Sequence, residues 1–231
     1  MGAKHNKKKS RTIVHSMLLF GQHFVGNTAL LESYEYMLKN NIEYDEKSNK
    51  PLDLDINAMH VANDYRFLDI PIKGEQNKEK IMKVKIWDSP GSERFRDIRP
   101  QVKNTQGLLL TYDITRRESF EHLNQWISQI KDVQDISIFP IVIVGCKFDL
   151  EDKRKVSTEE GQQLAEKYNL TFFETSALTE KGVKEAFSTL IQKIYDRNKR
   201  NQYICSFILN SLSSKSYLFY LKKYKYHCFY C

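Results

Sequence analysis

The sequence has few cysteines, and neither of its ends contains an acidic residue. Four cysteines stand among 231 residues, at positions 146, 205, 228 and 231, and their spacing fits neither a disulfide framework nor a zinc site. The first nine residues lack the apolar run of a secretory signal. With 41% hydrophobic and 28% charged residues, general disorder and a polytopic membrane protein are both excluded. These absences favour a reducing, cytosol-facing environment.

The positive charge of the chain is concentrated at its two ends. Residues 1–12 contain five basic side chains and residues 198–231 contain six, with no acid in either range. The formal net charge of the whole chain is +7, so residues 13–197 between these ends carry −4. Basic arms on an acidic body indicate attraction to an anionic surface such as a membrane, and they do not favour a nucleic-acid-binding face on the fold.

Short apolar segments alternate with helical patterns through the middle of the chain. The expected strands cover residues 13–20, 81–87, 107–112, 140–144 and 170–173. The expected helices begin near Asn27, cover 117–133, begin after Ser157 and cover 184–195. Ser157 followed by Glu160 has the spacing of a helix-capping pair. The alternation predicts an α/β fold with a mostly parallel sheet and helices on both faces.

Two stretches interrupt this alternation. Residues 39–63 are polar and weakly periodic, which indicates a long loop. Residues 203–221 are rich in Tyr, Phe, Leu and Ser. Three interpretations of this tail stay open. It is an interfacial segment, a membrane span disfavoured by its polar residues, or a tail translated wrongly from a faulty gene assignment. We therefore divide the chain into a basic arm (1–11), one domain (12–197) and a basic, aromatic tail (198–231).

Unusual residues follow four of the expected strands, where parallel sheets bind their ligands. The first strand runs into Gly21-Gln22-His23-Phe24-Val25-Gly26-Asn27-Thr28, which has the spacing of a phosphate-binding loop but carries Asn27 in place of Lys. Such a loop points backbone amides at phosphate oxygens, and Thr28 offers a hydroxyl to Mg²⁺. Asp88, followed by Gly91, suits a Mg²⁺-binding carboxylate beside a phosphate-sensing amide.

Together these motifs resemble the Ras superfamily of small GTP-binding proteins, and within it the Rab branch. The resemblance covers residues 12–197. Its strongest segments are Lys83–Asp88, Glu93–Arg96, Leu109–Phe120 and Glu174–Leu178. Two motifs look like Rab rather than Ras, Rho or Arf. They are the Trp87-Asp88 pair followed by Glu93-Arg94-Phe95, and the segment Tyr112-Asp113-Ile114-Thr115. The resemblance implies a small G domain of the P-loop NTPase type, with six strands and five helices.

The resemblance also assigns roles to individual residues. The implied nucleotide-binding residues are Gly21, Gln22, His23, Phe24, Val25, Gly26, Asn27, Thr28, Lys147, Asp149, Ser176 and Ala177. Of these, Asp149 would accept two hydrogen bonds from guanine, the Lys147 stem would lie over the base, and the loop at Ser176-Ala177 would read the guanine oxygen. Thr28 and Asp88 match the Mg²⁺ positions, and Gly91 matches the γ-phosphate position. The implied cofactors are GTP or GDP with Mg²⁺.

Several positions depart from the family pattern. Asn27 replaces the lysine that neutralises the β- and γ-phosphates, and Cys146 replaces the asparagine that braces the base site. Phe24 stands where the family has Gly or Ala, so its ring must turn outward to leave the loop open. Ser92 occupies the position of the catalytic glutamine and is too short to orient water, which predicts slow hydrolysis. The switch threonine aligns near His60, after an insertion of roughly a dozen residues.

The two ends carry partial lipidation signals. Met1-Gly2 begins like a myristoylation signal, but Asn6 stands where Ser or Thr is required. Rab proteins end in prenylated cysteines, which makes Cys228 and Cys231 the candidate lipid attachment sites, although Phe229 and Tyr230 depart from the usual aliphatic pattern. Basic residues just before Cys228 would add attraction to an anionic leaflet.

The sequence therefore predicts a Rab-like guanine-nucleotide switch in vesicle trafficking, with weak GTPase activity because the loop Lys and the switch Gln are replaced. Its expected partners are guanine nucleotide, effector and regulator proteins, and a membrane reached through a lipidated or basic tail, with no nucleic acid. Its expected location is the cytoplasmic face of intracellular membranes, in exchange with the cytosol. The alternative is a pseudo-GTPase that binds effectors as a scaffold without nucleotide cycling.

Overall fold

A single six-stranded sheet organises the protein. The computed structural model describes residues 13–42, 65–88 and 97–211. The strands are β1 (Val14–Gly21), β2 (Tyr65–Lys73), β3 (Glu79–Asp88), β4 (Leu108–Asp113), β5 (Ile141–Cys146) and β6 (Thr171–Glu174), in the spatial order β2-β3-β1-β4-β5-β6. Every pairing is parallel except that of β2 with β3. The predicted α/β fold with a mostly parallel sheet is confirmed.

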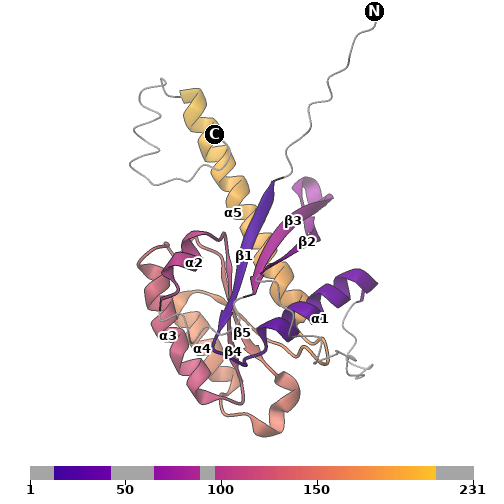
Figure 1. Cartoon of the computed structure of the whole chain (residues 1–231). Coiled ribbons are helices and arrows are strands. Elements are labelled where there is room, and N and C mark those ends of the chain that lie inside the picture. The colour runs from indigo at the N-terminus through magenta and orange to yellow at the C-terminus, as the bar shows by residue number, and fades with distance from the viewer. Residues whose placement is uncertain (1–12, 43–64, 89–96, 212–231) are drawn as a thin grey trace, which may run out of the picture.

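Helices cover both faces of this sheet (Figure 1). They are α1 (Asn27–Asn40), α2 (Arg99–Lys103), α3 (Arg117–Lys131), α4 (Thr158–Tyr168) and α5 (Val183–Ser211). Side chains of α1 and α5 bury one face together with β1, β2 and β3, and side chains of α3 and α4 bury the other with β1, β4 and β5. Both faces of β4 and β5 are therefore covered, which explains why these strands read as continuous apolar runs.

The starts of α4 and α1 differ in a way that bears on function. Ser157 caps α4 as predicted: its hydroxyl accepts from the Glu160 amide, and the Glu160 carboxylate accepts from the Ser157 amide. At the start of α1, the preceding residue is Gly26, and no side chain of the described residues caps the helix. The first-turn amides of α1 are thus left for another acceptor, since a helix start always presents unpaired donors.

The last helix is longer than the sequence predicted. We expected it to end near Tyr195, with a separate tail from residue 198, but α5 continues to Ser211. Lys199 pairs with Glu75 at 3.2 Å and the Tyr203 hydroxyl donates to Glu75 at 3.0 Å, so the helix extension contacts the β2–β3 hairpin. The 197/198 boundary therefore falls inside a helix. Likewise, residues 39 and 40 of the expected loop belong to α1.

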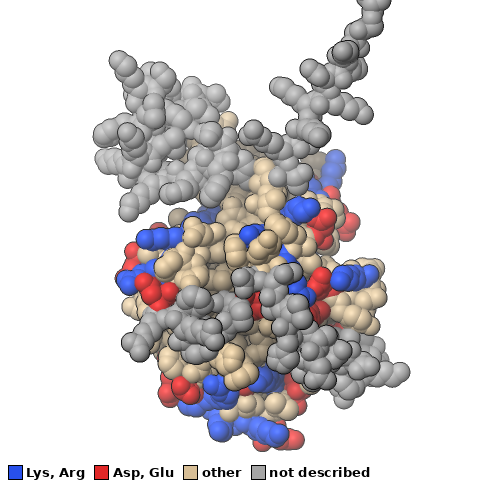
Figure 2. Space-filling model, viewed as in Figure 1, with Lys and Arg blue, Asp and Glu red and all other residues tan. Residues whose placement is uncertain are grey.

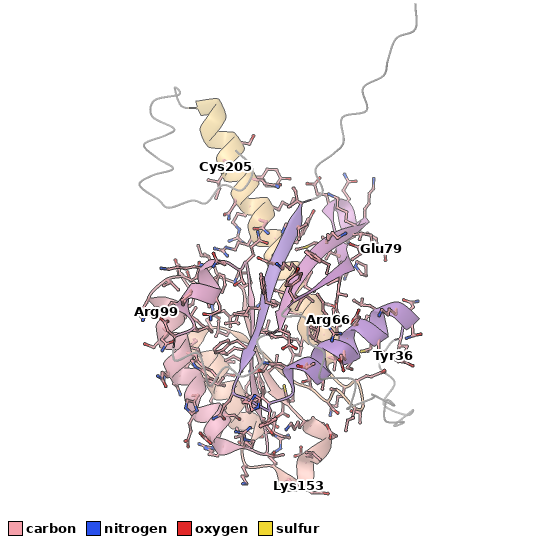
Figure 3. The ribbon with its side chains drawn as sticks, in the orientation of Figure 1. Tyr36, Arg66, Glu79, Arg99, Lys153 and Cys205 are labelled. Carbon is pink, nitrogen blue, oxygen red and sulfur yellow. The ribbon has the colours of Figure 1, made fainter. Side chains whose placement is uncertain are left out.

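The molecule has two distinct poles. Figure 1 shows the start of β1 and the far end of α5 at one pole, and the carboxyl ends of the parallel strands at the other. In Figure 3, Cys205 on α5 and Lys153 after β5 mark these opposite ends. Figure 2 shows basic and acidic side chains interspersed over the visible face. No helix within the described ranges is long and apolar enough to cross a membrane.

Candidate functional site

The loop between β1 and α1 has the backbone conformation of an anion-binding turn. Phe24 adopts a left-handed conformation with φ of 63°, and Gly26 has φ of 107°. Successive residues that alternate between right- and left-handed backbone direct their amides into one concavity. Phe24 is 75% exposed, so its ring is not buried within the protein; that the ring turns away from the phosphate position stays a prediction.

Gly21 is required where β1 passes into this loop. A Cβ atom built at Gly21 would clash with the Thr111 hydroxyl oxygen and would lie 2.6 Å from the Thr111 carbonyl oxygen of β4. Any side chain at this position would push the loop away from the sheet. The close approach places the Thr111 hydroxyl directly beneath the loop.

Asn27, in the lysine position, uses its side chain within the protein. The Thr111 hydroxyl donates to the Asn27 amide oxygen at 2.6 Å, and Asn27 is 8% exposed. The bond connects the first residue of α1 to β4. An amide carries no net charge, so the side chain at this position anchors the helix start to the sheet without supplying the positive charge that phosphate groups require.

Thr28 and Asp88, which the sequence predicts to bind Mg²⁺, are hydrogen-bonded to each other. The Thr28 hydroxyl donates to Asp88 Oδ2 at 2.6 Å, and Asp88 is 3% exposed at the end of β3. The second carboxylate oxygen, Oδ1, is buried without a hydrogen-bond partner among the described residues. Burial raises the pKa of Asp88, chiefly because desolvation disfavours its charged form. An unsatisfied buried carboxylate beside a hydroxyl fits a hard divalent cation such as Mg²⁺, which would favour the ionised form.

Lys147 connects the ends of two strands to the phosphate loop. Its ammonium group donates to the Phe24 carbonyl at 2.8 Å and lies 2.8 Å from Asp113 Oδ2. Asp113 is buried at the end of β4, and its other carboxylate oxygen accepts two hydrogen bonds from Thr115. This arrangement holds the lysine stem across the gap between β5 and the loop, where the family resemblance places the base.

Asp149 and Ser176 come from consecutive strand ends and meet at the same place. The Ser176 hydroxyl donates to Asp149 Oδ1 at 2.6 Å, and the Thr179 amide donates to that hydroxyl at 3.1 Å. Ser176 is fully buried, whereas Asp149 is exposed and Ala177 is half-buried. The arrangement presents a carboxylate to solvent beside the loop that contains Ala177, as the predicted guanine site requires.

Cys146 lies behind this site. The residue is 4% exposed, and burial raises the pKa of its thiol to about 12. Cys146 is the last residue of β5, and its protonated thiol packs as a small apolar group in the core. Its position is thus structural, and it provides no strong donor or acceptor toward a base.

Arg116 and Thr111 were missed by the sequence analysis. Arg116 Nη1 donates to the His23 carbonyl at 2.6 Å and Nη2 donates to Gln22 Oε1 at 3.1 Å, so the guanidinium binds the phosphate loop directly.

Asp113 was quoted only as part of a family motif, although it ends an apolar strand. Applying the strand-end rule to β4 would have found it, because polar residues at that edge converge.

The remaining predicted positions lie outside the described residues. They are Gly91 and Ser92 after β3, His60 in the expected insertion, and Cys228 and Cys231 in the tail. The predicted site residues that the structure does describe come from four strand ends. They are Gly21–Thr28, Asp88, Lys147, Asp149 and Ser176–Ala177. These residues lie at one pole of the sheet (Figure 1).

Comparison with known proteins agrees with this geometry. The model of the Ras family matches residues 16–196, which is most of the chain. This chain belongs to the Ras family. Ras-related protein Rab-15 of Homo sapiens is 30% identical over 83% of this chain and 82% of its own length, and Ras-related protein RGP2 of Oryza sativa subsp. japonica is 36% identical over 78% and 74%. These relatives place the chain in the Rab branch as a small GTP-binding protein.

A third relative matches over a shorter segment. Ras-related protein RABA4b of Arabidopsis thaliana is 41% identical over 54% of this chain and 56% of its own length. The aligned part of this chain thus spans little more than half of RABA4b. The family-wide match, by contrast, extends from β1 into α5 and includes each of the four strand ends that form the site.

Proposed function

We propose that this Rab-type protein is a guanine-nucleotide-dependent switch in membrane trafficking, with slow GTP hydrolysis. The observation that carries the proposal is the convergence of three parts at one pole. The Phe24–Gly26 turn and the uncapped start of α1 suit phosphate, and the Thr28–Asp88 pair suits Mg²⁺. Asp149 beside Ser176 suits the donor edge of guanine.

Binding is expected to be weaker than a complete site would give. A charge-assisted hydrogen bond contributes roughly 1.5–3 kcal/mol, so the neutral Asn27 side chain lowers nucleotide affinity about 10- to 100-fold. When bound, Mg²⁺ neutralises phosphate charge and fixes the phosphate groups. Ser92 is too short to orient water, which supports slow hydrolysis. Effector and regulator proteins would read the nucleotide state.

Purified protein is expected to contain about one guanine nucleotide per chain. Denaturation followed by chromatography of the released material measures this content. Chelation of Mg²⁺ with EDTA should then speed nucleotide release by about tenfold or more, because the phosphate charge loses its main counter-ion. Fluorescent GDP displaced by excess GDP, with and without EDTA, gives that rate.

The opposite result identifies the alternative function. A protein that purifies empty, and that binds no labelled GDP at micromolar concentration, is a pseudo-GTPase scaffold. ATP serves as the specificity control, since adenine lacks the donor pair that Asp149 would accept.

We also propose that the tail attaches the protein reversibly to cytosolic membrane faces through prenylated Cys228 and Cys231. Two lipid chains, or one chain with basic residues nearby, give stable membrane attachment. A fluorescent fusion with both cysteines changed to Ser should become fully cytosolic, whereas a Cys205→Ser fusion should keep the wild-type distribution. Unchanged membrane recruitment of the double variant would refute lipidation of these residues.

A further inference from the structure

The phosphate loop is held from outside by two cations that come from other strand ends. Arg116 precedes α3 and binds the His23 carbonyl at 2.6 Å, while Lys147 follows β5 and binds the Phe24 carbonyl at 2.8 Å. Two successive carbonyls of the loop are therefore each bound by a positively charged side chain. Both contacts flank the same residue, Phe24, whose backbone is left-handed.

The peptide between His23 and Phe24 links Arg116 to the phosphate position. Its carbonyl oxygen belongs to His23 and its N–H belongs to Phe24, and in a trans peptide these two groups point in opposite directions. A guanidinium bound at the oxygen end consequently fixes the direction of the N–H end as well.

Phe24 makes such an external contact necessary. A non-glycine residue with φ near +63° is strained, because its Cβ approaches the backbone, and the surrounding structure must hold it there. Phe24 is 75% exposed, and its ring lies against that of its neighbour His23 at 3.6 Å between centroids, a contact that does not connect the turn to the sheet. The side chains of Arg116 and Lys147 hold the turn through the two carbonyls on either side of the strained residue.

The second arm of Arg116 fixes the neighbouring residue. Arg116 Nη2 donates to Gln22 Oε1 at 3.1 Å, and Gln22 Nε2 donates to Glu118 at 2.9 Å. The amide orientation is unambiguous, since the reverse orientation would place its donor against the guanidinium and its acceptor against the carboxylate. Arg116 therefore binds two consecutive loop residues with one planar group, which a lysine cannot do.

We propose that Arg116 is a positioning residue for the nucleotide phosphates: by binding the His23 carbonyl and Gln22, it holds the loop in its anion-binding conformation while Asn27 supplies no charge. This role rests on the proposed nucleotide binding. Arg116 acts through the loop backbone and through Gln22 and would not itself need to touch the phosphates.

The test is a double-mutant cycle between Arg116 and Phe24. Arg116→Gln is expected to release fluorescent GDP about tenfold faster than wild type, and Arg116→Lys, which keeps one donor group, about threefold faster. In a Phe24→Gly background the loop adopts its left-handed turn without strain, so Arg116→Gln should then change the release rate less than about twofold. Arg117→Gln is the matched control, because the Arg117 guanidinium pairs with Glu121 and Glu160 instead of the loop.

Two results would overturn the proposal. One is a release rate for Arg116→Gln equal to that of wild type. The other is an equal acceleration in the wild-type and Phe24→Gly backgrounds, which would show that Arg116 acts through general stability or net charge. Thermal unfolding of each variant separates loop positioning from general stability. If Arg116 only stabilises the fold, Arg116→Gln lowers the unfolding temperature equally in the wild-type and Phe24→Gly backgrounds.

A nucleotide-free wild-type protein would refute the proposed function but would still leave the positioning role testable. The same cycle is then measured by hydrogen exchange of the Val25 amide, which donates to the Gln22 carbonyl at 3.3 Å across the turn. If this amide exchanges faster in Arg116→Gln than in wild type, and added inorganic phosphate does not slow its exchange in the variant, the result supports the positioning of the loop by Arg116. Unchanged exchange overturns it.

Discussion

Asn27→Lys is expected to tighten the binding of GDP and GTP at least tenfold. The ammonium group would form charge-assisted hydrogen bonds to phosphate oxygens, each worth about 1.5–3 kcal/mol, where about 1.4 kcal/mol corresponds to a factor of ten. The variant loses the bond from Thr111 and places a second cation near Lys147. The empty variant should therefore unfold at a lower temperature than empty wild type, while the nucleotide-bound variant should be more stable. Titration with fluorescent GDP measures the affinity.

Two controls separate a local contact from a general charge effect. Asn40→Lys adds the same charge at the far end of α1, and we expect its GDP affinity to match that of wild type within about twofold. Asn27→Gln lengthens the side chain without charge and should not tighten binding. If Asn27→Lys leaves the affinity unchanged, residues 21–28 are not the phosphate loop.

Asp149→Asn is expected to weaken GDP binding at least about 100-fold and to create binding of xanthosine diphosphate. Guanine presents two N–H groups that match the two oxygens of a carboxylate. Replacing the carboxylate by an amide therefore removes two charge-assisted hydrogen bonds of about 1.5–3 kcal/mol each. Xanthine has a carbonyl in place of the exocyclic amine and matches an amide, which has one acceptor and one donor group. Competition of each nucleotide against fluorescent GDP or its xanthine analogue measures both effects.

Asp152→Asn is the matched control for this exchange. Asp152 is an exposed carboxylate in the same short helix as Asp149, Phe148–Lys153. Its neutralisation changes the charge equally and should alter GDP affinity by less than about twofold. Retention of guanine binding by Asp149→Asn would show that the base is read elsewhere, and the position of the site at the ends of β5 and β6 would then be wrong.

Local signals in the sequence were sufficient to predict the main elements of the fold. The apolar runs at residues 107–112 and 140–144 correspond to β4 and β5, because a strand covered on both faces needs apolar residues at every position. Ser157 and Glu160 start α4 because their side chains satisfy amides within one turn.

The end of α5 could not be read in the same way. Beyond Tyr195 the helical pattern weakens, and the change of composition near residue 198 indicated a separate tail. The helix extension contacts distant parts of the chain: Lys199 and Tyr203 bind Glu75 on the β2–β3 hairpin, more than a hundred residues earlier, and Asn198 binds His15 of β1. Contacts of this kind depend on how the hairpin and helix pack, and local propensity does not encode them.

The sequence alone determined that β1, β3, β4, β5 and β6 form and which chemical groups follow them, since these follow from hydrophobic periodicity and residue type, while the observed strands end one or two residues later than predicted. Only the tertiary structure decided how those groups connect. Asn27 is bound to Thr111, Asp88 keeps one buried oxygen unsatisfied among the described residues, and Arg116 holds the His23 carbonyl across 93 positions of sequence. The physical reason is that hydrogen bonds and charge pairs are set by distances of about 3 Å in space, which only the packing of the strands fixes.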